Sequence, residues 1–194
     1  MTCLCLTRNR RQWLPQAIRC YQAQTYPNRE LLIIADGEPV HDLIPDDPSI
    51  RYVHIAGHSQ IGAKRNLGCE RARGEVIAHW DDDDYSAPGR LRDQVERLEG
   101  FGVTGYRTLR FTDGTRWWLY SGASNYAPGS TLCYRKSFWE SNKFPDIQIG
   151  EDQSFVTKAR NTLVLSDAGD LMHATIHPGN TSPRQLDTKQ WKEL

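Results

Sequence analysis

The fold of this chain is decided by residues 75–84, Glu-Val-Ile-Ala-His-Trp-Asp-Asp-Asp-Asp. The first six form a largely apolar run typical of a buried strand, and four consecutive aspartates follow it. Adjacent carboxylates repel one another, so this loop must either be solvated or hold a cation. Carboxylate oxygens with few neighbours suit Mg²⁺ or Mn²⁺, with substrate phosphates completing the shell. An EF-hand is excluded, because its glycine and glutamate are missing at the required spacings after these aspartates.

The residues around this stretch alternate between strand and helix patterns. Apolar runs and apolar side chains at helical spacing predict, in chain order, strand, helix, strand, strand, helix, strand and helix at residues 1–6, 13–21, 31–35, 50–55, 63–72, 75–80 and 90–98. This alternation predicts an α/β fold with an open, largely parallel sheet and helices on its faces. Ligands of such sheets bind beyond the carboxyl ends of the strands, where Asp36 and the four aspartates fall.

The second half of the chain is predicted to contain a smaller antiparallel portion. Residues 106–112 and 116–120 form a predicted hairpin that turns at Asp113-Gly114. Further strands and helices are expected at residues 131–134, 136–142, 151–161, 163–166 and 172–176. We therefore expect one domain over residues 1–182, with halves 1–100 and 101–182. Residues 183–194 should form a polar tail with a short helix.

The composition of the 194 residues is that of an ordinary globular protein and indicates no particular partner. Hydrophobic residues make up 38% and charged residues 25%, and 24 basic side chains balance 24 acidic ones. The net charge therefore favours neither nucleic acid nor a membrane surface. The first 29 residues nevertheless carry five arginines and no acid. These arginines leave a nucleic-acid partner open, beside the simpler interpretation of a solvated helix face.

The cysteines and the apolar segments predict where in the cell the protein is found. Five cysteines without C-x-x-C spacing match neither a zinc site nor a disulfide framework, and a cytoplasmic setting is the simplest expectation. We recognise no signal peptide and no apolar stretch approaching ~20 residues, so no integral membrane segment is predicted.

Several motifs occur in the order found in a known enzyme family. Residues 62–66 are Gly-Ala-Lys-Arg-Asn, and residues 72–84 combine an Ala-x-Gly-Glu turn with the strand that ends in aspartates. Residues 34–37 (Ile-Ala-Asp-Gly), 150–152 (Gly-Glu-Asp) and 177–182 (His-Pro-Gly-Asn-Thr-Ser) bracket that core. Together they resemble family 2 glycosyltransferases, which are inverting enzymes with a D-x-D motif. The resemblance implies a GT-A fold, a Rossmann-like open and mostly parallel sheet flanked by helices.

The resemblance also implies a donor site for a nucleotide-diphosphate sugar. A UDP-sugar is favoured, with Asp36 accepting a hydrogen bond from the base, although Ala35 stands where the family has a first aspartate. The remaining expected donor residues are Thr7, Arg65, Asp81 and Asp82. Asp83 is the expected direct ligand of Mn²⁺ or Mg²⁺, and Asp81 lies toward the ribose or the metal.

The acceptor side is implied by the motifs of the second half. Asp152 is the expected general base that takes a proton from the acceptor hydroxyl, and Glu151 is the alternative. Each could instead simply cap a helix. His177 could approach the diphosphate or the metal, or be an ordinary loop residue. Residues 126–131 lie where the family tends to form its acceptor pocket.

Other functions and partners stay open. A sugar nucleotidyltransferase would need a glycine-rich loop after the first strand, but residues 7–11 contain no glycine. A glycoside hydrolase could use two carboxylates on a sugar, and a non-catalytic module could bind a nucleotide sugar or a glycan on the same fold. A glycan is the expected acceptor, and a homo-oligomer could supply acceptor contacts from a partner subunit.

Overall fold

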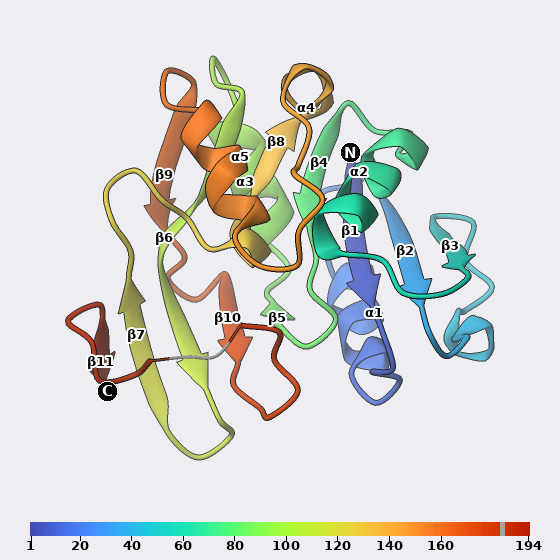
Figure 1. Ribbon diagram of the computed structural model, residues 1–194, viewed down its shortest axis with the longest axis horizontal. Helices are drawn as coiled ribbons and strands as arrows, with labels where there is room; N and C mark the ends of the chain where they lie inside the picture. The colour runs from blue at the N-terminus through green and yellow to red at the C-terminus, as the bar shows by residue number, and fades with distance from the viewer. Residues whose placement is uncertain (183–184) are drawn as a thin grey trace.

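The computed structural model, described for residues 1–182 and 185–194, forms one 11-stranded sheet with helices on its faces (Figure 1). The strands are β1 (Thr2–Thr7), β2 (Glu30–Asp36), β3 (Ile50–Ile55), β4 (Val76–His79), β5 (Tyr85–Ser86), β6 (Val103–Thr112), β7 (Trp117–Ser121), β8 (Cys133–Arg135), β9 (Leu163–Asp167), β10 (Met172–Thr175) and β11 (Trp191–Glu193). The helices are α1 (Leu14–Gln22), α2 (Ile61–Arg71), α3 (Arg90–Arg97), α4 (Lys136–Ser141) and α5 (Glu151–Lys158), with 3₁₀ turns η1 (His41–Leu43) and η2 (Gly129–Thr131). The main path of the sheet runs β11-β7-β6-β8-β4-β1-β2-β3.

The first four strands, β1 to β4, are all parallel to one another. β1 lies between β2 and β4, with Thr2 opposite both Glu30 and Ile77, and β3 completes the edge beyond β2. Every residue of β2 is buried, as the uninterrupted apolar run predicts for a parallel strand covered on both faces. Parallel pairing also brings the carboxyl ends of β1 and β4 to the same edge. The predicted α/β class and the location of the aspartates at that edge are confirmed.

The second half continues the same sheet with mixed pairing. β8, β6, β7 and β11 follow β4 in antiparallel order, while β9 and β10 pair with β6 in parallel. The predicted hairpin is confirmed as β6 and β7, with Thr112 opposite Trp117. The helix expected in the tail is wrong for residues 185–194, because residues 191–193 form β11 against β7. Pro183 and Arg184, at the start of that predicted tail, lie outside the described residues.

Two layers of helices bury the two faces of the sheet. Apolar side chains of α1 and the end of α3 pack on one face with alternate residues of β1 and β2, such as Cys3 and Leu31. Side chains of α2, α4 and α5 pack on the other face with the intervening residues, such as Leu4 and Leu32. All five cysteines are buried free thiols. The chain thus uses them as small core residues.

One close backbone approach fixes the position of α2 beside the second half of the sheet. A Cβ atom on Gly62 would lie 1.8 Å from the carbonyl oxygen of Pro145, so only glycine fits there. The Gly62 N–H donates to the carbonyl of Ile147 at 3.1 Å. The segment before α5 is therefore held against the first turn of α2, which brings both helix N-termini to one place.

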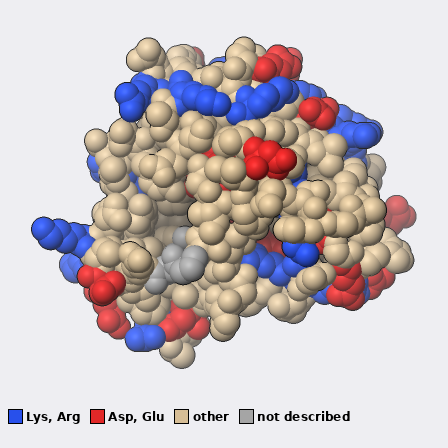
Figure 2. All heavy atoms as spheres, viewed as in Figure 1, with Lys and Arg blue, Asp and Glu red and all other residues tan. Residues whose placement is uncertain are grey.

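Basic side chains gather along one edge of the molecular surface. Lys and Arg side chains form a band along the upper edge of the face in Figure 2, near α4 and the upper end of α5 in the same view. Among the described residues, no helix is long and apolar enough to cross a membrane.

Candidate active site

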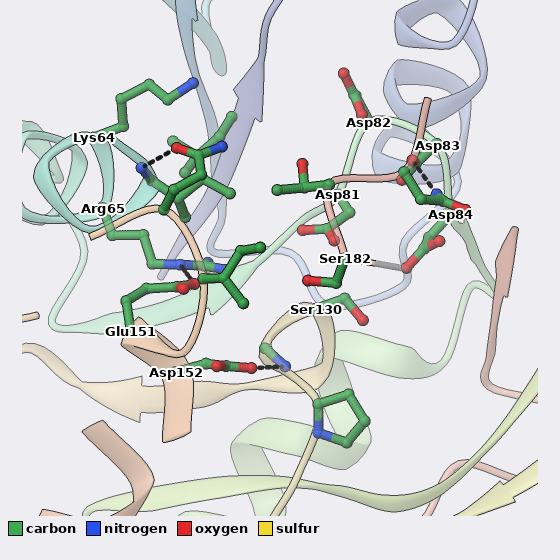
Figure 3. Close-up of a pocket in the computed structure, with 18 of the residues that line it drawn as sticks. Lys64, Arg65, Asp81, Asp82, Asp83, Asp84, Ser130, Glu151, Asp152 and Ser182 are labelled. Atoms are coloured by element: carbon green, nitrogen blue, oxygen red, sulfur yellow. Dashed lines mark hydrogen bonds and ion pairs between the residues drawn. The ribbon is translucent and has the colours of Figure 1, made fainter. Parts of the chain in front are cut away.

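A cavity of about 460 Å³ opens at the carboxyl ends of β1 and β4 (Figure 3). The loop after β4 forms one wall and the first turn of α5 forms the opposite wall, with Lys64 and Arg65 of α2 beside Glu151 (Figure 3). Of the predicted site residues, the structure places seven in the lining: Thr7, Arg65, Asp81, Asp82, Asp83, Glu151 and Asp152. Asp36 and His177 lie behind this lining and contact residues within it.

The aspartate wall concentrates negative charge away from water. Asp81, Asp83 and Asp84 each offer a carboxylate oxygen, and these oxygens all lie within 4.8 Å of one another. Burial, and then the nearby Asp83 carboxylate, raise the pKa of Asp81, of Asp82 to about 6, and of Asp84 well above its usual value. Like charges at such spacing favour neutralisation by a cation. The all-oxygen donor set fits Mg²⁺ or Mn²⁺.

Asp83 is also held by protein donors. Arg10 Nη1 donates to Asp83 Oδ2 and to Asp82 Oδ1, each at 2.9 Å. His177 Nε2 and Asn180 Nδ2 reach the same Asp83 oxygen at 2.9 and 3.2 Å. The ring of His177 stacks on Trp13, with centroids 4.8 Å apart. His177 therefore lies beside the carboxylate cluster, where it positions Asp83.

Asp36 forms a buried ion pair with the first turns of α2. Its side chain is fully buried, and it accepts hydrogen bonds from Lys64 Nζ at 2.6 Å and from the backbone N–H of Ser59 at 3.0 Å. Burial alone would raise the pKa of Asp36, but these hydrogen bonds outweigh it and hold the pKa below its usual value. The carboxylate is thus kept charged at the end of β2, with Lys64 between it and the cavity.

Arg65 links α2 to α5 through a second buried ion pair. Its Nε donates to Glu151 Oε1 at 3.0 Å, and its Nη1 donates to the ring of His79 at 2.5 Å. Burial, and then Arg65, lower the pKa of His79 well below its usual value, so that this histidine is neutral. Burial raises the pKa of Glu151, and Arg65 partly offsets the shift. Glu151 therefore serves as the partner that satisfies Arg65.

Asp152 is oriented by donors from two segments. Its Oδ2 accepts from the N–H of Gly129 at 2.9 Å and from the hydroxyl of Tyr126 at 3.0 Å. Its Oδ1 accepts from the N–H of Gln153 at 2.8 Å, within the first turn of α5. A Cβ on Gly129 would lie only 2.9 Å from Asp152 Oδ2, so a larger residue there would displace this carboxylate. The carboxylate faces the aspartate wall across the cavity (Figure 3).

Arg10 and Asn180 are site residues whose contacts the sequence does not indicate. Arg10 follows β1 at the same sheet edge as the aspartates, but its partners Asp82 and Asp83 lie 72 and 73 residues away. Asn180 belongs to the segment 177–182 quoted above, and its contact with Asp83 spans 97 residues. The only sequence signal for Arg10 is its position just beyond a strand end.

Comparison with known proteins identifies the family. The sequence model described as Glycosyl transferase family 2 matches residues 3–154. The chain belongs to glycosyl transferase family 2. The matched stretch ends within α5, so it includes both walls of the cavity.

Relatives of this family 2 member are much longer proteins. An uncharacterised glycosyltransferase of Rickettsia felis is 29% identical over 167 residues, and that match covers 74% of this chain and 27% of the relative. A Rickettsia bellii glycosyltransferase is 34% identical, with coverages of 74% and 24%. The chain thus spans about a quarter of the length of these relatives.

A solved structure confirms the fold of this family 2 member. S. aureus TarS, crystallised with UDP-GlcNAc, superposes with a TM-score of 0.76 at 17% identity, over 93% of this chain and 59% of that one. The predicted GT-A fold is therefore confirmed. At this identity the likeness concerns the fold alone.

Proposed function

We propose that this protein is an inverting, metal-dependent glycosyltransferase that moves a sugar from a UDP-sugar to an acceptor hydroxyl, with Asp152 as general base. The observation that carries the proposal is the placement of Asp152 and the aspartate cluster on opposite walls of one cavity. A transferase must hold a leaving diphosphate on one side of the anomeric carbon and deprotonate an attacking hydroxyl on the other.

The donor would bind along the wall formed by β1, α2 and the loop after β4. Asp83 and Asp81 would hold Mg²⁺ or Mn²⁺, which supplies Lewis-acid chemistry by neutralising the diphosphate as it leaves. Asp36 is fully buried and separated from the cavity by Lys64, so it would act on a uracil-type base through Lys64, which it holds at the cavity lining, and not by direct contact. Arg65 adds positive charge close to the phosphates. A UDP-linked sugar is favoured because TarS has been solved with UDP-GlcNAc and with UDP.

The acceptor would enter beside Asp152. The Gly129 N–H and the Tyr126 hydroxyl hold one oxygen of this carboxylate, which fixes its orientation before any acceptor arrives. Asp152 would take the hydroxyl proton as the oxygen attacks the anomeric carbon from the face opposite the diphosphate, and the configuration at that carbon inverts. Positioned proton transfer of this kind contributes roughly 100- to 10,000-fold to a rate.

The decisive experiment separates donor binding from transfer. A panel of nucleotide sugars is screened for Mn²⁺- or Mg²⁺-dependent release of the nucleoside diphosphate, followed by calorimetry of UDP on the wild type and on Asp83→Ala. We expect UDP to bind the wild type only with metal, and to bind Asp83→Ala at least ~100-fold more weakly, as expected for loss of a metal ligand.

The exposed Asp146, in the segment before α5, provides the matched control. Asp146→Ala should bind UDP and metal as the wild type does. Unchanged UDP binding in Asp83→Ala would remove the proposed metal site. Metal-dependent binding without any turnover would instead indicate a binding module, and hydrolysis of glycosides without nucleotide would indicate a hydrolase.

A further inference from the structure

A second surface cavity lies on the acceptor side of the molecule. It is lined by Arg107, Ser124, Asn125, Arg160, Leu163 and Leu165. Two guanidinium groups, a hydroxyl and an amide are thus gathered around two partly buried leucines, and no acidic residue is in the lining. Arginine presents a planar fork of N–H donors that matches phosphate or carboxylate groups.

The position of Arg107 results from an irregularity in the sheet. In the pairing of β6 with β9, Tyr106 lies opposite Ser166 and Thr108 opposite Asp167, so Arg107 is an extra residue. Such a bulge redirects a side chain and is frequent beside functional sites. The carbonyl of Arg107 accepts the N–H of Gly122 at 2.9 Å, which ties the segment after β7 to the bulge.

Neither guanidinium is neutralised by a close buried acid. The nearest carboxylate oxygen to Arg107 belongs to Asp167 at 3.7 Å, and both side chains are exposed, so this pair contributes little in water. Arg160 follows α5, is exposed, and forms no ion pair with any described carboxylate. The cavity thus offers positive charge to a ligand, at the end of α5 where Figure 2 shows the band of basic side chains.

Two structural elements connect this cavity to Asp152. Ser124 and Asn125 line the second cavity, whereas the next residue, Tyr126, lines the first and donates to Asp152. The helix α5 begins at the active site and ends just before Arg160. At 1.5 Å per residue its eight residues span about 12 Å. An extended ligand whose hydroxyl lies at Asp152 can therefore reach the two arginines.

We propose that this cavity binds an anionic group of the acceptor, so that the acceptor is a phosphate- or carboxylate-bearing glycan chain. The anion lies about 12 Å from the reacting hydroxyl, the length of α5. The inference rests on the proposed function in that it assigns the acceptor to the Asp152 side. The binding itself can be measured without any turnover.

The test compares three oligomers of equal length. One is a neutral oligomer of galactose, one is an oligomer of galacturonic acid that carries carboxylates, and one is an oligomer of glycerol linked by phosphodiesters. Binding is measured by calorimetry on the wild type and on Arg107→Gln/Arg160→Gln, at two salt concentrations. We expect the wild type to bind one or both anionic oligomers, with affinity falling as salt rises. Loss of charged hydrogen bonds should weaken that binding roughly 10- to 100-fold in the variant, and binding of the neutral oligomer should stay unchanged. Preference for galacturonic acid identifies a carboxylate ligand, and preference for the glycerol oligomer a phosphate.

The control variant, Arg19→Gln/Arg73→Gln, removes the same charge from exposed positions outside both cavities. Equal losses in the two double variants would overturn the proposal, because a general charge effect would then explain binding. Equal losses for neutral and anionic oligomers would also overturn it. Arg107→Lys/Arg160→Lys, which keeps the charge, should recover part of the affinity. UDP binding in the presence of metal should be the same in the wild type and in all these variants. If the anionic oligomers bind but UDP does not, the result counts against the proposed transferase and not against the anion site.

Discussion

The two walls of the cavity both carry carboxylates, yet they hold negative charge in different ways. On the wall after β4, Asp81, Asp83 and Asp84 are crowded together, and burial and mutual repulsion raise the pKa of Asp81 and Asp84. On the α5 wall, Glu151 is paired with Arg65, and Asp152 accepts three hydrogen bonds.

On the wall after β4, four aspartates share one close guanidinium among the described residues, that of Arg10, and keep an excess of negative charge, whereas the carboxylates of the α5 wall are compensated by their own donors. A bound cation relieves the repulsion between crowded carboxylates, so these residues should contribute to the binding of metal and diphosphate. The carboxylates of the α5 wall, Glu151 and Asp152, are fixed in geometry before the reaction, as catalytic groups require. Mutations on the aspartate wall should therefore change metal and diphosphate binding, and mutation of Asp152 on the α5 wall should change the rate of transfer.

The largest effect is expected from Asp152→Asn on the α5 wall. The amide keeps the volume and can still accept from Gly129 and Tyr126, but it cannot take a proton. Transfer should fall roughly 100- to 10,000-fold, while metal-dependent UDP binding stays at the wild-type level. Single-turnover rates beside UDP calorimetry check this expectation, with Asp146→Asn as the control. A rate within tenfold of the wild type would remove Asp152 as the base.

Glu151→Ala should act on stability first. Arg65 would then be left as a buried charge without its main partner, and breaking such a pair costs about 3 kcal/mol or more. Urea denaturation should show this loss in the free energy of unfolding. Glu140→Ala, on the exposed side of α4, should change it by less than about 0.5 kcal/mol. Comparable stability in the two variants would show that Arg65 is satisfied by other groups.

The type and order of most elements in both halves could be predicted from the sequence, whereas the pairing of the second-half strands and two short strands could not. The strand at residues 31–35 is predicted to within a residue or two because a buried parallel strand is a continuous apolar run, and the strand at residues 50–55 is predicted by its alternating pattern. The short β5 and β11 carry no such signal. They exist because β5 pairs with β10, and β11 with β7, across long sequence separations.

The same distinction applies to the site. Asp81, Asp83 and Arg65 occur in a recognisable run that predicts their place in the site, and the structure places all three in the cavity lining. The contacts that hold these residues in place cannot be predicted from the sequence. The contacts of Arg10 with Asp83 and of Tyr126 with Asp152 depend on how distant segments are packed, and nothing local in the sequence encodes them.

On the aspartate wall, Asp84→Asn should stabilise the metal-free protein. The folded pKa of Asp84 is raised above its unfolded value, so this carboxyl favours folding when protonated and opposes it as pH rises through the folded pKa. At pH 8 in EDTA the amide should therefore increase the free energy of unfolding, because it removes a buried carboxylate that opposes folding once it is charged. Stabilisation by Mn²⁺ should decrease. Loss of stability in EDTA would show that the carboxylates are not mutually unfavourable.

Tyr126→Phe should give the smallest change, and it tests whether the α5 wall owes its geometry to several donors or to one. The substitution removes one hydrogen bond to Asp152 Oδ2 and leaves the Gly129 N–H on the same oxygen. A neutral donor of this kind contributes roughly 0.5–1.5 kcal/mol, and the lower end applies because the backbone donor remains. We expect kcat to fall roughly threefold, with UDP binding unchanged. Tyr85→Phe, which changes a tyrosine outside both cavities, is the control. A loss as large as that of Asp152→Asn would mean that the tyrosine itself takes part in proton transfer, and the backbone would then be a passive support rather than the principal anchor of the base.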